Sequence, residues 1–169
     1  QNVAPSATNF TSFTQLFFAM NSCGVSGPAT INVVTGSGPY YENVEFGDIL
    51  GMSSINTVTI NGNGEAIIDS GNTSTNNAAV LLNGTDHLIL DSLSIEKVGT
   101  TNSVGVQFMN SADSNIVRNC EIEVSASVTT STVIPVTFSG SATSSTTSGI
   151  NGNYNLLEGN TIIGGYYGI

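Results

Sequence analysis

Short runs of alternating apolar and polar residues recur along the chain and predict short β-strands. One run places Leu93 and Ile95 two residues apart, and a later run places Cys120 and Ile122 in the same way. Turn-forming residues, chiefly Asn, Gly and Ser, separate the runs. We therefore expect an all-β protein built from many short strands.

The runs repeat at a fixed distance in the sequence. Residues 83–96 and 110–123 align with an offset of 27 residues and share five of fourteen positions. A third copy at 154–163 follows after an offset of 40 residues. Strands at such a period can pair in parallel with their equivalents one repeat later, each coil rising by about 4.8 Å. The repeat predicts a parallel β-solenoid, and the alternative, a β-sandwich of hairpins, is disfavoured by the matched registers.

We expect a right-handed parallel β-helix of about four to five coils over residues 29–169. The earliest coil is expected at 29–34 and 43–46, and a weaker copy of the repeat follows at 57–69. The Ser- and Thr-rich stretch at about 125–152 lengthens the last interval, so it is expected to form a long loop that leaves the repeat.

Residues 1–28 form a separate N-terminal segment with a helical pattern. Its apolar residues recur at helical spacing, and these are Phe10, Phe13, Leu16, Phe17 and Met20. Ser12 and Gln15 resemble a capping box, so a short helix is expected over 12–22, ending near Cys23. The first coil of a solenoid exposes its interior and a strand edge, and we expect this helix to cover both.

The composition excludes several classes of protein. Only 8% of the residues are charged, and 12 acidic residues against 2 basic ones give a net charge of -10. Two cations cannot neutralise a phosphate backbone, so no nucleic-acid partner is expected. Apolar residues make up 39% of the chain, which argues against disorder, but no apolar run is long enough for a transmembrane segment. The 62 residues that are Ser, Thr or Asn are typical of an extracellular β-protein rather than of a helical bundle.

The order of motifs along the chain resembles one known group of proteins. The motifs are the Phe-rich helix, CGVSGPATINV at 23–33, TVTING at 57–62, VLLNGT at 80–85, NIVRNCEI at 115–122 and the segment 153–169. They look like the N-terminal region of large secreted bacterial proteins with right-handed parallel β-helix, pectin-lyase-like repeats, typical of bacteria with type IX secretion. The resemblance implies the fold and a secreted or cell-surface location, but it implies no activity.

Stacking of the repeats places Asp91, Arg118 and Glu158 in one column. An arginine between two carboxylates predicts a charge ladder between coils. As an alternative, Asp91 and Glu158 would lie two coils apart, roughly 10 Å, near the carboxyl separation of inverting glycosidases. Arg118 would keep both ionised, which does not suit a general acid. A lyase base is equally weak, because Lys97 and Arg118 each adjoin an acidic residue.

A second column holds polar residues at a turn. Asp86 and Asp113 stack there, and their oxygens are of the kind that bind Ca²⁺, although Asx turns that shape the corner are the favoured interpretation. Asn83 and Asn110 are expected to form a side-chain amide ladder. The chain holds one histidine, His87, so neither a catalytic triad nor a zinc cluster is expected from one coil, and we expect no resident cofactor.

The two cysteines are expected to remain unpaired. Cys120 lies about three coils beyond Cys23, near 14 Å away, whereas a disulfide needs Cα atoms within about 7 Å. We predict two free, buried thiols that behave as small apolar residues.

These observations favour a non-enzymatic, structural or adhesive segment of a large secreted or cell-surface protein. The expected partners are the rest of the same polypeptide beyond Ile169, surface glycans, and secretion or anchoring machinery. One alternative is a carbohydrate-active enzyme, a polysaccharide lyase or an inverting glycosidase, whose active coils lie partly beyond this region. Another is a filament subunit that assembles through an open C-terminal edge.

Overall fold

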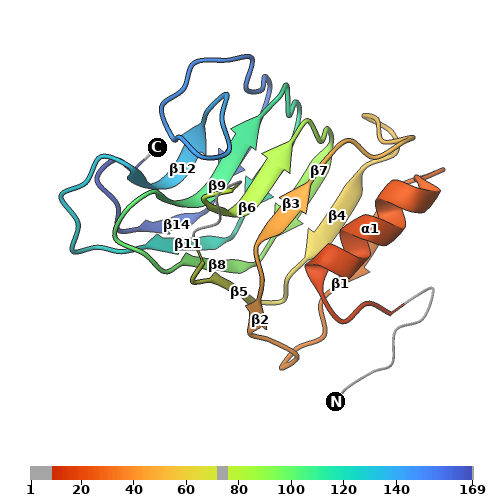
Figure 1. The fold of residues 1–169 in the computed structure, drawn as a ribbon. Helices are drawn as coiled ribbons and strands as arrows, with labels where there is room; N and C mark the ends of the chain where they lie inside the picture. The colour runs from red at the N-terminus through yellow and green to blue at the C-terminus, as the bar shows by residue number, and fades with distance from the viewer. Residues whose placement is uncertain (1–8, 72–75, 169) are drawn as a thin grey trace.

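The computed structural model describes residues 9–71 and 76–168 and shows a parallel β-solenoid with one short helix at its N-terminal end (Figure 1). Three parallel sheets run along the molecule, and each coil contributes one strand to each sheet. Four coils are complete in this way, and a fifth supplies strands to the first two sheets. The all-β parallel β-helix predicted from the repeat is confirmed.

The strands of each sheet are consecutive coils in register. The first sheet contains β1 (Ala29–Asn32), β4 (Val58–Asn61), β7 (Leu88–Asp91), β10 (Ile116–Arg118) and β13 (Leu156–Glu158). The second sheet contains β2 (Tyr40–Tyr41), β5 (Ala66–Asp69), β8 (Ser94–Lys97), β11 (Glu121–Val124) and β14 (Thr161–Ile163). The third sheet contains β3 (Val44–Phe46), β6 (Ala78–Asn83), β9 (Ser103–Met109) and β12 (Val133–Phe138).

The sequence offsets correspond to strand pairing. Ile95 of β8 pairs with Ile122 of β11, which is the 27-residue offset, and Ile122 pairs with Ile162 of β14, which is the 40-residue offset. Ile67 of β5 pairs with Ile95 in the same column. Ile67, Ile95 and Ile122 face the interior and are at most 1% exposed. The alternation seen in the sequence is therefore the alternation between the core and the outer faces.

The helix α1 (Phe13–Cys23) covers the first coil, as predicted. Phe13, Leu16 and Met20 are buried against that coil. The ring of Phe17 also meets that of Phe46 edge to face, with centroids 6.0 Å apart. The expected N-terminal segment, 1–28, is described from residue 9 onward.

Both ends of the helix are capped. Ser12 is the N-cap and its hydroxyl accepts the N–H of Gln15 at 3.1 Å, which is one half of the predicted capping box. The Gln15 side chain turns instead to Thr11, accepting its N–H and hydroxyl. Gly24 ends the helix with a φ of 67°, where a β-carbon would lie 2.7 Å from a carbonyl oxygen of the next loop.

The sequence prediction of a long loop over about 125–152 is wrong in its first half, because strand β12 runs through it. β12 pairs in parallel with β9 over Val133–Phe138 and completes the fourth coil. Its inward residues alternate in the usual way, but Ser and Thr surround the run and Pro135 lies within it. Proline is tolerated here because β12 is an edge strand of the described sheet.

The segment after β12, residues 139–152, folds back over the outer face of the third sheet (Figure 1). Its backbone accepts hydrogen bonds from that face, because Gln107 donates to the carbonyl of Ser141 and the Asn77 side chain to that of Thr143, both at 2.8 Å. Leu81 and Val104 are buried beneath it, each 1% exposed. The third sheet is therefore apolar on both faces, which explains the long apolar run of β6.

The chain continues onto the fourth coil after β14. Gly165 donates its N–H to the carbonyl of Ser125 at 3.1 Å, and Tyr166 donates to Val133 at 2.8 Å. These bonds follow the same coil-on-coil pattern as the earlier strands. Ile169, where we expected an open edge, lies outside the described residues.

Candidate functional site

Asp91, Arg118 and Glu158 lie in one column of the first sheet, as predicted. Arg118 Nε donates to Asp91 Oδ2 at 2.8 Å, and the side chains are 38% and 17% exposed. Glu158 is the next residue in register, but within the described part of the chain Arg118 forms an ion pair with Asp91 only. The predicted three-residue ladder is thus an ion pair with a neighbouring carboxylate.

Two further side chains hold Asp91 in place. Ser92 donates its hydroxyl to Asp91 Oδ1 at 2.9 Å, and Asn119 donates from the next coil at 3.0 Å. Burial acts to raise the pKa of Asp91, but the hydrogen bonds from Asn119, Ser92 and Arg118 and the positive charge of Arg118 lower it below its ordinary value. Asp91 is therefore a stable carboxylate, whereas a general acid must keep its proton near neutral pH.

The same column continues toward the N-terminal end as an amide pair. Asn61 donates from Nδ2 to Asn32 Oδ1 at 3.1 Å, and Asn61 pairs in register with Asp91. The outer edge of the first sheet therefore carries a continuous polar stripe over five coils, formed by Asn32, Asn61, Asp91, Arg118 and Glu158. This stripe is open to solvent and lies on a flat sheet.

The calcium candidates Asp86 and Asp113 are used between coils. Asp86 Oδ1 accepts the N–H of Asp113 at 2.7 Å, and Asp113 Oδ1 accepts the N–H of Asn153 at 2.5 Å. Each carboxylate thus points toward the backbone of the next coil. Among the described residues no group of three His, Cys, Asp or Glu side chains is arranged to hold a metal ion.

Asn83 and Asn110 form the amide ladder that the repeat predicts. Asn110 Nδ2 donates to Asn83 Oδ1 at 2.6 Å, and Asn83 Nδ2 donates to Glu45 Oε1 at 2.7 Å. His87 lies at the adjacent corner with a φ of 57°, and its N–H donates to the carbonyl of Asp113. Polar groups at this corner hold successive coils together.

A buried ion pair lies at the end of β5 and β8, and the sequence reasoning missed it. Lys97 Nζ is 2.5 Å from Asp69 Oδ2, with side chains 0% and 7% exposed. The sequence interpretation paired Lys97 with Glu96, but successive residues of a strand face opposite sides. The signal was present in the alternation, because Lys97 stands two residues after the inward Ile95 and 28 residues after Asp69.

The two cysteines differ, so the prediction of two buried thiols is wrong for one of them. Both are free, but Cys23 is exposed at the last turn of α1, on the side of the helix away from the coil. Cys120 is buried, and burial is the main cause that raises the pKa of its thiol. Helical spacing explains the error, because Cys23 falls three residues after the inward Met20 but in the last turn, beyond the first coil.

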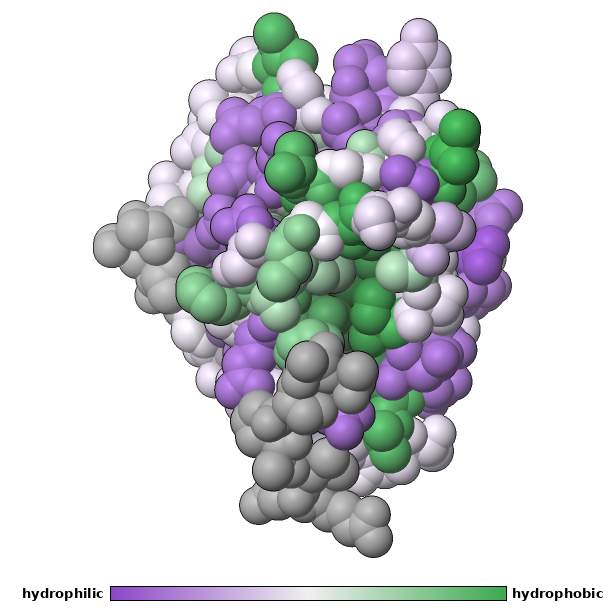
Figure 2. Space-filling model, turned by 90° about the vertical axis from the view of Figure 1, so that its right-hand side faces the viewer, coloured by the Kyte–Doolittle hydropathy of each residue, from purple (hydrophilic) through white to green (hydrophobic). Residues whose placement is uncertain are grey.

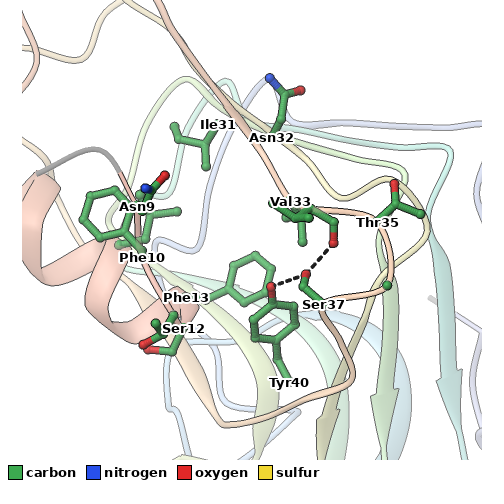
Figure 3. Close-up of a pocket in the computed structure, with 14 residues that line it drawn as sticks. Asn9, Phe10, Ser12, Phe13, Ile31, Asn32, Val33, Thr35, Ser37 and Tyr40 are labelled. Carbon is green, nitrogen blue, oxygen red and sulfur yellow. Dashed lines mark hydrogen bonds between the residues drawn. The ribbon is translucent and has the colours of Figure 1, made fainter. Parts of the chain in front are cut away.

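A groove of about 370 Å³ lies between α1 and β1 at the N-terminal end (Figure 3). Phe10, Phe13, Ile31, Val33 and Tyr40 line it, and polar atoms from the turn after β1 lie at its rim. Figure 2 looks onto this end of the molecule, where hydrophobic residues gather around a hollow. Its walls are the inner face of the first coil and the helix that covers it.

The tyrosines do not form one platform for stacking sugars. Tyr40 packs against Phe13 with ring centroids 5.0 Å apart, and its hydroxyl lies 2.6 Å from that of Ser37. Tyr154 is 89% exposed near the other end, and Tyr166 and Tyr167 pack against each other there. The aromatic side chains therefore belong to opposite ends of the solenoid.

No family model, curated protein or solved structure matches this chain. The only helix within residues 9–71 and 76–168 is too short to cross a membrane.

Proposed function

We propose that this chain is a rod-like structural or adhesive segment of a secreted or cell-surface protein. The observation that carries the proposal is the use made of its polar side chains. Asp86, Asp113, Asn83 and Asn110 all bond to the neighbouring coil rather than converge on a common point. Asp91 likewise bonds to Arg118 and Asn119 of the next coil. Groups arranged in this way hold coils together and leave little chemistry for turnover.

The surface composition supports an extracellular role. The chain has only two basic residues, and both form ion pairs within the fold. The outer faces therefore present carboxylates and uncharged polar groups, which limit non-specific association with acidic polymers and membranes. Neutral glycans are the partners that such a face suits, because hydroxyl and amide groups of the polar stripe can exchange hydrogen bonds with sugar hydroxyls.

The proposal is tested by binding and turnover measured on the same protein. We expect signals for neutral glycans on a glycan array or for intact cells, and no release of products from pectin, alginate or neutral polysaccharides. Asn61→Ala and Asn32→Ala should weaken glycan binding, whereas Glu121→Gln on the second sheet serves as the matched control. Catalytic turnover that survives purification would contradict the proposal.

A carbohydrate-active enzyme is the second candidate, and one observation favours it. Asp91 and Glu158 lie two strand spacings apart on one face, roughly 10 Å, near the separation of inverting carboxylates. The lowered pKa of Asp91 suits a general base rather than an acid, so Glu158 would have to donate the proton. Turnover that both Asp91→Asn and Glu158→Gln abolish would establish this candidate and remove the first.

A further inference from the structure

The most enclosed reactive group of the molecule is the amine of Lys97. Its side chain is fully buried, and its Nζ lies 2.5 Å from Asp69 Oδ2. Asp69 and Lys97 are register partners on the neighbouring strands β5 and β8. An amine and a carboxyl group are thus held in contact where water has little access, between two successive coils.

The surroundings orient both groups. The backbone N–H of Gly71 donates to Asp69 Oδ1 at 2.8 Å, while the Gly71 carbonyl accepts a hydrogen bond from Lys97 Nζ. Asn43 Nδ2 donates to Asp69 Oδ2 at 3.0 Å from the preceding coil. The two carboxyl oxygens therefore have different partners, because Oδ1 faces a backbone donor and Oδ2 faces the amine.

We propose that Lys97 and Asp69 condense to an amide, an intramolecular isopeptide bond between β5 and β8. Enclosing two charges away from water costs free energy that their attraction often fails to offset. A neutral amide removes both charges and keeps the same two residues together. The water released leaves a site that is closed to solvent, which favours the amide over its hydrolysis.

The step balances within the pair itself. The ammonium of Lys97 passes one proton to Asp69 Oδ2, and the lone pair of the resulting amine forms a bond to Asp69 Cγ. Negative charge develops on Oδ1, where the Gly71 N–H is placed to stabilise it. A second amine proton then moves to Oδ2, the Cγ–Oδ2 bond breaks, and Oδ2 leaves as water. An ammonium and a carboxylate become one amide and one water, with no oxidant or co-reactant.

Such a bond would join two adjacent coils covalently, so that they could not be pulled apart along the axis. The inference is independent of the proposed function, since it concerns the covalent state of the chain and no ligand or substrate.

The test is the mass of a defined fragment of the full chain. Cyanogen bromide cleaves after Met20, Met52 and Met109, so one fragment, 53–109, holds both Asp69 and Lys97. We expect this fragment to be lighter than its sequence by one water molecule and to resist trypsin at Lys97 under denaturing conditions. An unmodified mass overturns the proposal. So does loss of water with normal cleavage at Lys97, which indicates a succinimide at Asp69.

Further outcomes and variants make the test specific. A bond from Lys97 to Asn43 would instead join the fragments 21–52 and 53–109 with loss of ammonia, and that result also overturns the proposal. Lys97→Met and Asp69→Ala should each restore the unmodified mass. Arg118→Lys is the matched control, because it places an amine beside the more exposed Asp91, where we expect no condensation.

Discussion

At the scale of single residues, the position of each side chain follows from its place in the coil. Ile67 and Ile68 are neighbours in β5, but Ile67 faces the core with 1% exposure and Ile68 lies on the outer face. Ile67 stacks on Ile95 and then on Ile122, so a missing side chain leaves a gap between filled layers. The core is close-packed along the axis, and single inward residues should therefore matter strongly.

This pair gives a direct test of the inward column. Ile67→Ala is expected to lower the free energy of unfolding by about 2–5 kcal/mol, because it removes buried methyl groups and leaves a cavity. Ile68→Ala makes the same chemical change on the outer face, so its loss should be much smaller. Urea unfolding followed by circular dichroism measures both. Equal losses would mean that the assignment of inner and outer faces is wrong.

Glu42 is a second residue whose role depends on its position. Its carboxylate accepts the N–H groups of Phe13 and Thr14 at 2.8 and 2.9 Å. The first turn of α1 contains no acidic residue of its own, so Glu42 supplies a negative charge to the helix N-terminus from the first coil. This contact ties the covering helix to the solenoid.

Glu42→Gln should therefore loosen the helix more than the rest of the molecule. We expect a loss of about 0.5–2 kcal/mol in the free energy of unfolding, since one accepting oxygen and the charge are removed. Amide hydrogen exchange at Phe13 and Thr14 should become faster. Glu121→Gln, an exposed residue of β11, is the control and should change neither quantity appreciably. Unaltered exchange at the helix would contradict the capping role.

At the scale of the elements, the turns between the first and second sheets are stacked copies of one another. Ser92, Asn119 and Gly159 occupy the same place with φ values of 55°, 53° and 63°. Each N–H of the first two donates to a carbonyl of the next coil at 3.1 Å. Asp91 precedes the first of these turns and bonds across to the second through Asn119. This turn is where the titration of a side chain should affect stability.

Acid should weaken this contact between coils. The pKa of Asp91 is lower in the folded chain than its ordinary value of 3.8, so its stabilisation is fully present above that value. It is lost as the pH falls through the lower folded pKa. The stability difference between the wild type and Asp91→Asn should thus be constant above about pH 5 and shrink below about pH 4. Urea unfolding of both proteins from pH 7 to pH 2 measures it, and a constant difference throughout would be inconsistent with the lowered pKa.

At the scale of the whole molecule, the repeat in the sequence determined the register of the coils, because identical spacing brings Ile95, Ile122 and Ile162 together. Side chains in the repeat, such as Asp91 and Arg118, could therefore be paired from the sequence. Contacts outside the repeat could not. Glu42 reaches a helix almost thirty residues earlier, and β12 is concealed by the Ser and Thr residues around it. These depend on how non-repeating segments fold back onto the coils, which periodicity does not encode.

The distribution of charge is also a property of the whole molecule. The net charge is -10, and both basic residues are engaged, Lys97 in the interior and Arg118 with Asp91. Glu96 and Glu123 are register partners on the outer face of the second sheet, so two carboxylates lie one strand spacing apart, about 4.8 Å at the backbone. Glu121 lies on the same face but pairs with Ser94 and Thr161. The coil-on-coil stacking that satisfies amides and hydrogen bonds elsewhere brings like charges together here.

Removing one of the stacked carboxylates should therefore stabilise the protein. Glu123→Gln is expected to raise the free energy of unfolding by about 0.2–1 kcal/mol at low ionic strength, because like charges directly opposite each other on neighbouring strands destabilise a sheet. Glu121→Gln removes the same charge from the molecule without relieving that pair, so it should stabilise less. The Debye length falls from about 30 Å at 0.01 M salt to about 8 Å at 0.15 M, so sodium chloride should stabilise the wild type and narrow its gap to Glu123→Gln. Urea unfolding at both salt concentrations distinguishes the effects: equal gains from the two variants would show that net charge matters and that register does not.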